Sequence, residues 1–95
     1  MTDHLPAALA RQVGERNEIA IRSASPGDAA AIRRLAHLVD RTVPANPVLV
    51  AESDGAIVAA LSTSSNEIVT DPFQATGDLV ALLELRSAQL HALAA

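Results

Sequence analysis

The chain contains 95 residues, carries a formal net charge of −4, and has no cysteine, tryptophan or tyrosine. A chain of this length forms one domain and buries only about 60–65% of its unfolded surface, which favours stabilisation by a partner subunit. All seven basic residues are scattered arginines, which argues against a nucleic-acid partner. The lack of cysteine excludes disulfides, thiolate metal ligands and thiol nucleophiles.

Residues 1–17 read as an N-terminal leader that precedes a domain at residues 18–95. Its apolar residues recur at helical spacing and are Leu5, Ala8, Leu9 and Val13. This spacing predicts a short amphipathic helix, although Gly14 and the shortness of the segment equally favour fraying. No basic segment precedes an apolar run, and no apolar run approaches about 20 residues. We therefore expect a soluble cytoplasmic protein without a signal peptide or a membrane span.

Residues 18–22 (EIAIR) alternate in polarity, which predicts a strand with Ile19 and Ile21 on its buried face. A helix should start at Ser25-Pro26-Gly27-Asp28, where serine is a capping type, proline suits the first turn and aspartate is the acid of a capping box. We expect this helix to end near Arg41. Its apolar stripe consists of Ile32, Leu35, Ala36 and Val39, and its water-facing residues of Arg33, Arg34, His37 and Asp40.

Three more strands are expected after two helix-breaking prolines, Pro44 and Pro47. The first of them is apolar along nearly its whole length and so belongs in the middle of a sheet. Asp54 and Gly55 follow it as a hairpin turn, because this pair readily adopts positive φ. The sequence thus predicts an α+β fold, a four-stranded and mainly antiparallel sheet packed with two main helices. The expected strands cover residues 18–22, 48–52, 57–63 and 67–70.

The last helix is expected to begin near Thr76 and to run toward Ala94. Leu82 and Leu85 lie well off the line formed by Leu79, Leu83 and Leu90, and one stripe facing a sheet needs only about half of the helix's apolar residues. A helix of this kind is buried on two sides, which a small monomer does not supply. The sequence therefore predicts a homodimer, with another protein partner as the alternative. The expected interface residues are Leu82, Leu85, Leu90 and Leu93.

The order of these elements resembles the N-terminal half of the GNAT N-acetyltransferase superfamily. The segment IAIRSASPGDAAAIRRLA resembles the family's opening strand and helix start, and VLVAESDGAIVAAL resembles its central hairpin. The resemblance covers roughly residues 18–93 and depends on the order and spacing of the pieces together. It implies a partial GNAT-like fold.

The family's acyl-CoA signature is Gln or Arg, two residues, Gly, one residue, then Gly or Ala at the start of a helix, whose N–H groups hold the pyrophosphate. Gln74 and Gly77 match this signature, whereas Leu79 replaces the small residue and is expected to obstruct the pyrophosphate. Asp78 adds a negative charge beside an anion site. The resemblance thus implies a degenerate acyl-CoA loop made of Gln74, Thr76, Gly77 and Asp78.

The family's general base is often a glutamate on a middle strand, which makes Glu52 and Glu67 the catalytic candidates. We expect both instead to lie at strand ends in water. The family continues past the last helix into elements that complete the cofactor cleft, whereas this sequence stops at Ala95. The leading hypothesis is a truncated, non-catalytic domain for homo-oligomerisation or protein interaction that uses no cofactor. The alternative is an acetyl-CoA-binding protein or minimal N-acyltransferase whose cleft a second chain completes.

Phe73, the only aromatic residue, is expected to anchor its loop into the core. Asp71 is expected to end the strand or to bond the loop backbone. A third hypothesis, ranked last, has residues 5–13 docking on a membrane or a larger complex. No metal site is expected, because the histidines lack metal-ligand spacing; they are His4, His37 and His91.

Overall fold

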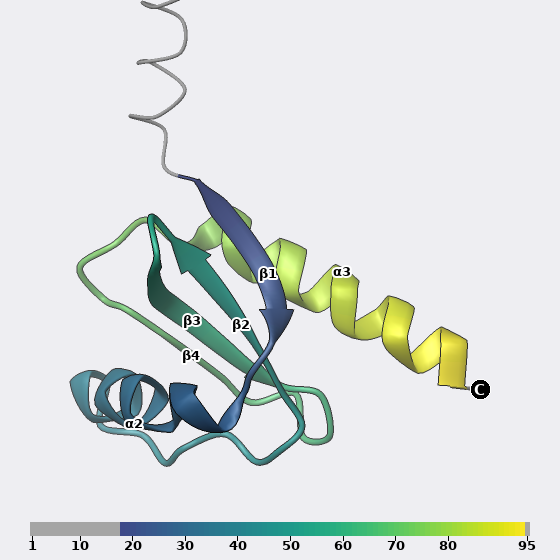
Figure 1. The fold of residues 1–95 in the computed structure, drawn as a ribbon, viewed down its shortest axis with the longest axis horizontal. Helices are drawn as coiled ribbons and strands as arrows, with labels where there is room; N and C mark the ends of the chain where they lie inside the picture. Colours follow the sequence, from purple (N-terminus) through teal and green to yellow (C-terminus); the bar gives the residue numbers. More distant parts are fainter. Residues whose placement is uncertain (1–17, 95) are drawn as a thin grey trace, which may run out of the picture.

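The computed structural model describes residues 18–94 and shows a four-stranded antiparallel sheet with one helix on each face (Figure 1). The sheet order follows the sequence, β1-β2-β3-β4, so every connection joins neighbouring strands. This arrangement confirms the expected α+β class. The expected leader at residues 1–17 lies outside the described residues. The elements are β1 (Ile19–Ser23), the 3-10 turn η1 (Pro26–Asp28), α2 (Ala29–Leu38), β2 (Val48–Ser53), β3 (Ala56–Ser62), β4 (Ile68–Thr70) and α3 (Gly77–Ala94).

The first helix begins as its sequence predicts but ends earlier, at Leu38 rather than near Arg41. Asp40 adopts a left-handed conformation with φ of 54°, which ends the helical path. The N–H of Arg41 bonds the carbonyl of Ala36 at 2.9 Å, and the N–H of Asp40 bonds that of His37 at 3.2 Å. These two bonds form a Schellman motif, with aspartate at the position that glycine usually takes.

The hairpin between β2 and β3 turns at Asp54 and Gly55, as expected. Their φ values of 53° and 84° are those of a type I′ turn, whose twist matches that of paired strands. The carboxylate of Asp54 also accepts the N–H of Glu18 at 2.9 Å, which ties the turn to the start of β1. A register shift between Ala51 and Glu52 marks a bulge near the end of β2.

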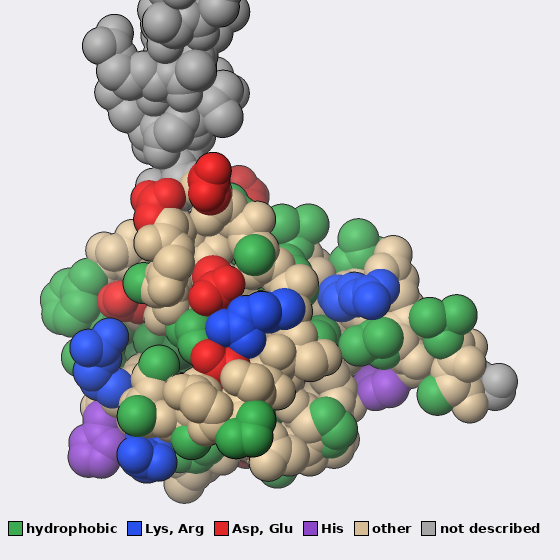
Figure 2. Space-filling view, in the orientation of Figure 1, with side chains coloured by type: hydrophobic (Ala, Val, Ile, Leu, Met, Phe, Trp, Pro, Cys, Tyr) green, Lys and Arg blue, Asp and Glu red, His purple; other side chains and the backbone are tan. Residues whose placement is uncertain are grey.

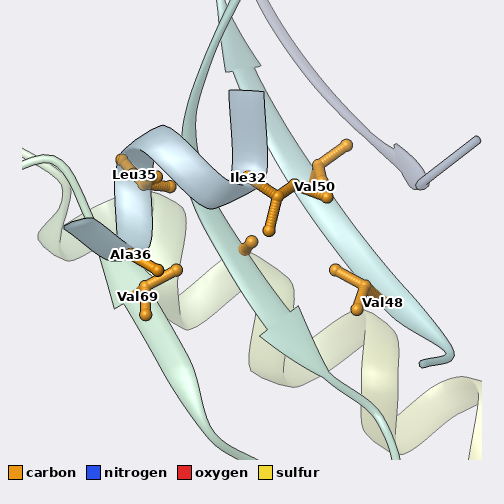
Figure 3. Close-up of a cluster of buried hydrophobic side chains, with 7 residues drawn as sticks. Ile32, Leu35, Ala36, Val48, Val50 and Val69 are labelled. Atoms are coloured by element: carbon orange, nitrogen blue, oxygen red, sulfur yellow. The ribbon is translucent and has the colours of Figure 1, made fainter. Parts of the chain in front are cut away.

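Two hydrophobic clusters fill the two faces of the sheet. On one face, Ile32, Leu35 and Ala36 of α2 cover residues of the three later strands (Figure 3). On the other face, Leu79 and Leu83 of α3 cover residues of β2 and β3. Because helices cover β2 on both faces, its run of apolar residues is buried throughout, which confirms its expected central place. The strand residues under α2 are Val48, Val50, Ala60 and Val69; those under α3 are Leu49, Ala51, Val58, Ala59 and Leu61.

Within residues 18–94, neither helix is both long enough and apolar enough to cross a lipid bilayer.

Candidate functional site

Helix α3 carries a second, exposed apolar stripe besides the one that packs on the sheet. Leu82, Leu85 and Leu93 are 43%, 56% and 78% exposed. The inner stripe contains Leu79, Leu83 and Ser87, which are buried, and Leu90, which packs against the same core. Leu90, expected at the interface, therefore lies on the inner face of the helix. The outer stripe is defined by Leu82, Leu85 and Leu93.

The outer stripe lies on the side of α3 that faces β1. The opposite side of the helix borders a hollow next to β3, lined by Glu84, Ser87, Ala88 and His91 together with Leu61 and Asn66. There the ring Nε2 of His91 lies 2.8 Å from the carbonyl oxygen of Thr63. With 3.6 residues per turn, Leu82 and Leu93 project away from this hollow, toward β1. Figure 2 shows apolar side chains along α3, interrupted by a basic one.

The loop between β4 and α3 is held by its own backbone and by Asp71. The carboxylate of Asp71 accepts the N–H of Phe73 at 2.8 Å, and its carbonyl accepts that of Gln74 at 3.3 Å. The expectation that Phe73 anchors the loop is wrong, because its side chain is 81% exposed. Aliphatic residues already close the core beneath α3, and the Asp71 turn directs Phe73 into solvent.

The start of α3 offers an open backbone but few groups that favour an anion. The carbonyl of Thr76 accepts the N–H of Val80 at 2.9 Å, and a Cβ built on Gly77 meets no described atom within 4 Å. Leu79 is buried in the core at 5% exposure, so its side chain does not obstruct this opening, contrary to expectation. Asp78 is exposed, and the sequence from Asp71 to Leu79 contains no basic residue.

The two glutamates proposed as catalytic candidates have different surroundings. Glu67 is exposed, as expected. Glu52 is instead half-buried, and its two carboxylate oxygens lie 3.3 and 3.2 Å from Nε and Nη2 of Arg22. A carboxylate held by a guanidinium is a structural partner rather than a free base.

Arg22 also binds Asp28, the capping residue of the first helix. Nη1 and Nη2 lie 2.7 and 3.0 Å from the two carboxylate oxygens, which is a bidentate pair. These bonds hold the pKa of Asp28 well below its usual range, with a further contribution from the N–H of Ser25. The same bonds raise the pKa of Arg22. The sequence analysis did not predict this ion pair. Its signal in the sequence is Arg22, the one charged residue of β1, six residues before the capping acid Asp28.

A larger hollow, of about 720 Å³, lies between the start of α2 and the loop that leads to β2. Its lining is mostly apolar and includes Ile32, Val43 and Pro44, with Arg33 at its border. Within residues 18–94, its lining contains no carboxylate and no histidine. Among the described residues, no group of three or more His, Cys, Asp or Glu side chains is placed to hold a metal ion.

Comparison with known proteins finds no match to this chain among protein-family models, curated proteins or solved structures.

Proposed function

We propose that this chain is a non-catalytic interaction domain that self-associates through the outer stripe of α3. The observation that carries the proposal is the exposure of Leu82, Leu85 and Leu93 on a helix whose sheet-facing stripe is separate and already buried. Single exposed leucines are ordinary on protein surfaces, whereas several on one helix face are typical of a surface that another protein covers.

The free energy gained by burying the outer stripe favours self-association, but it is of the same order as the cost of associating. Full burial of a leucine contributes about 1.5–3 kcal/mol. From their exposed fractions, the three stripe leucines of both copies would together contribute about 5–10 kcal/mol on burial. Association costs an estimated 4–15 kcal/mol in lost freedom. The stripe alone therefore supports a weak dimer, and a stable one needs a further contact.

The test is the mass of the full chain by light scattering across a range of protein concentrations. We expect a dimer for the natural sequence and a monomer for the Leu82→Gln, Leu85→Gln double variant. Leu38→Gln is the matched control, because Leu38 is 47% exposed, like Leu82, but lies on α2. A monomeric natural chain, or a double variant that stays dimeric, would overturn the proposal.

An alternative function is binding of acetyl-CoA at the loop before α3, as the resemblance to acetyltransferases implies. The open space at Gly77, at the start of an 18-residue helix, favours it because free N–H groups and the helix dipole attract phosphates. The carboxylate of Asp78 and the lack of a nearby basic residue in the loop oppose it. For this reason we rank it second.

Isothermal titration of acetyl-CoA and of CoA into the full chain separates the two functions. The interaction function predicts no binding heat. The alternative predicts micromolar binding that a bulky replacement, Gly77→Val, weakens at least tenfold by filling the open space. Gly27→Val is the control, because Gly27 lies in η1, a different element from the loop and α3.

A further inference from the structure

Within residues 18–94, strand β1 forms one edge of the sheet, and its outer side presents backbone groups that pair with no other strand. One of them, the carbonyl of Ser23, accepts a hydrogen bond from Nη1 of Arg22 at 3.2 Å. It pairs with β2 from Ile19 opposite Ser53 to Ser23 opposite Leu49. The bonds from Asp54 N–H to the Glu18 carbonyl and from Ala24 N–H to that of Val48 show that even-numbered residues bond inward. In an antiparallel ladder, the N–H and C=O groups of the odd-numbered residues then point outward. These residues are Ile19, Ile21 and Ser23.

This edge lacks the features that usually protect a strand from pairing with another chain. Natural edges carry proline, bulges or outward charges, or are very short. Among its five residues β1 has no proline, and its register with β2 is regular at every paired residue of β1. Its one charged residue, Arg22, binds Asp28 and Glu52 over the sheet face, and its Nη1 also donates to the carbonyl of Ser23 at 3.2 Å, so at this edge it contacts only the last residue of β1.

The opposite edge differs. Strand β4 has only three residues, and Pro72 follows the strand closely. The two edges are therefore unequal, and β1 is the one suited to accept another strand.

We propose that β1 pairs antiparallel with β1 of a second copy about a two-fold axis at Ile21, so that two four-stranded sheets become one. This inference rests on the proposed self-association and supplies the further contact that the outer stripe of α3 requires. Two identical antiparallel strands are self-complementary about a two-fold axis, and the occupant of this edge is therefore a second copy of the chain.

The outward groups of β1 select this register. With the axis at Ile21, Ile21 faces the partner's Ile21, and Ile19 faces the partner's Ser23. Each such pair exchanges two backbone hydrogen bonds. The outward groups of all three residues are then used, and the Ser23 carbonyl, which already accepts Nη1 of Arg22, accepts the partner's N–H with its second lone pair. Moving the axis by one residue leaves one of the three odd-numbered residues without a facing residue in the partner's β1.

Side chains on both faces of the seam suit this register. On the α2 face, Glu18 lies diagonally across from the partner's Arg22 and is attracted by its charge without a direct hydrogen bond, because that guanidinium already bonds Asp28, Glu52 and Ser23 of its own chain. On the α3 face, Ile21 packs against the core and Ile19 is 48% exposed. By helix geometry, Leu82 and Leu93 project toward the β1 side of α3, the side on which the seam lies. Figure 1 shows β1 crossing in front of α3, whose C-terminal part runs on beyond the strand.

The first test removes one outward donor without touching the β1–β2 ladder. Ser23→Pro deletes an outward N–H, and proline is tolerated on an edge strand when its nitrogen faces outward. Two seam hydrogen bonds are lost per dimer by symmetry, so we expect the dimer Kd to rise by about tenfold or more. Ser23→Ala keeps the N–H and is the matched control, with no change expected.

The second test reads the register directly, since the chain contains no natural cysteine. At a facing, hydrogen-bonded pair the Cα atoms lie about 5.5 Å apart, within the range of a disulfide. Under mild oxidation, Ile21→Cys should therefore form a covalent dimer on a non-reducing gel. Ile19→Cys should not, because the two copies of position 19 are four residues apart along the seam, about 13 Å.

The outcomes separate the two proposals. A dimer that Ser23→Pro weakens and Ile21→Cys cross-links supports the seam. A natural dimer that neither variant affects overturns the seam and leaves self-association through α3 standing. A natural chain that is monomeric at all concentrations overturns both.

Discussion

The guanidinium of Arg22 in β1 donates two hydrogen bonds, of 2.7 and 3.0 Å, to the carboxylate of Asp28. Asp28 is the last residue of the turn before α2. Asp28 also accepts the backbone N–H and the hydroxyl of Ser25, and Glu52 of β2 binds the same guanidinium. One arginine thus joins two strands to the start of a helix. It reaches over the sheet face to these carboxylates, and it contacts the outer edge of β1 only at the carbonyl of Ser23, which accepts Nη1 at 3.2 Å.

The first prediction concerns pH and Asp28. Its pKa is lowered in the folded state, so its ionised form contributes stability above the usual aspartate range, and this contribution is lost as the pH falls through and below that range. Asp28→Asn should therefore unfold at lower temperature than the natural chain near neutral pH, with the gap closing in acid. Thermal unfolding from pH 7 down to about pH 2 measures this, because the free carboxyl of aspartate titrates near pH 4. Asp40→Asn, exposed and without a partner in the described ion pairs, is the control; a gap for Asp28→Asn that is constant with pH would contradict the prediction.

The second prediction tests which face of α3 is buried within one chain. Leu83 is fully buried against the sheet, so Leu83→Ala should lower the free energy of unfolding by about 2–5 kcal/mol. Leu82→Ala, one residue along and 43% exposed, should lower it by about 1 kcal/mol or less when measured on the monomer. Urea denaturation at low protein concentration gives both values. Equal losses in the free energy of unfolding would mean that Leu82 is as buried as Leu83 within one chain, which would contradict the separate inner and outer stripes.

The third prediction concerns two buried serines, one whose hydroxyl has no hydrogen-bond partner among the described residues and one whose hydroxyl accepts two hydrogen bonds. The hydroxyl of Ser87 on α3 is buried and has no partner among the described residues. Ser87→Ala should therefore leave stability unchanged or raise it by about 1 kcal/mol, because an unsatisfied polar group is removed. Ser62 is also buried, but its hydroxyl lies 3.3 and 3.1 Å from the backbone nitrogens of Ser64 and Ser65. Ser62→Ala should destabilise the chain by about 1–3 kcal/mol, and chemical denaturation compares the pair.

The fourth prediction contrasts two glycines. Gly55 has φ of 84° in the hairpin turn, a conformation that other residues rarely adopt, so Gly55→Ala should destabilise by about 1–2 kcal/mol. At Gly27 an added Cβ meets only the Ser25 hydroxyl, at 3.9 Å. Gly27→Ala should be neutral or stabilise by about 0.4–1 kcal/mol, because it restricts the unfolded chain. Thermal unfolding separates the two; a harmless Gly55→Ala would argue against the type I′ turn.

The sequence alone determined the class, the order of elements and most of the core. Periodicity was sufficient for this, because a stripe such as Ile32, Leu35 and Ala36 has only one face on which to be buried, and all three are buried. Local chemistry was sufficient for the Asp54–Gly55 turn and for Asp71, whose carboxylate bonds the loop backbone as expected. These features depend on residues close together in the chain.

Tertiary structure alone decided the features that join distant residues. Glu52 meets Arg22 thirty residues away, which no local pattern indicates, and so it is half-buried rather than free in water. Phe73 is exposed because aliphatic side chains had already filled the core, and Leu79 faces that core rather than the loop. The edge position of β1 likewise follows from the sheet order. Periodicity predicts which face of a helix or strand is buried. Only the packed sheet decides which residues that face contacts and which strands lie at the edges, because both depend on how segments far apart in the sequence come together.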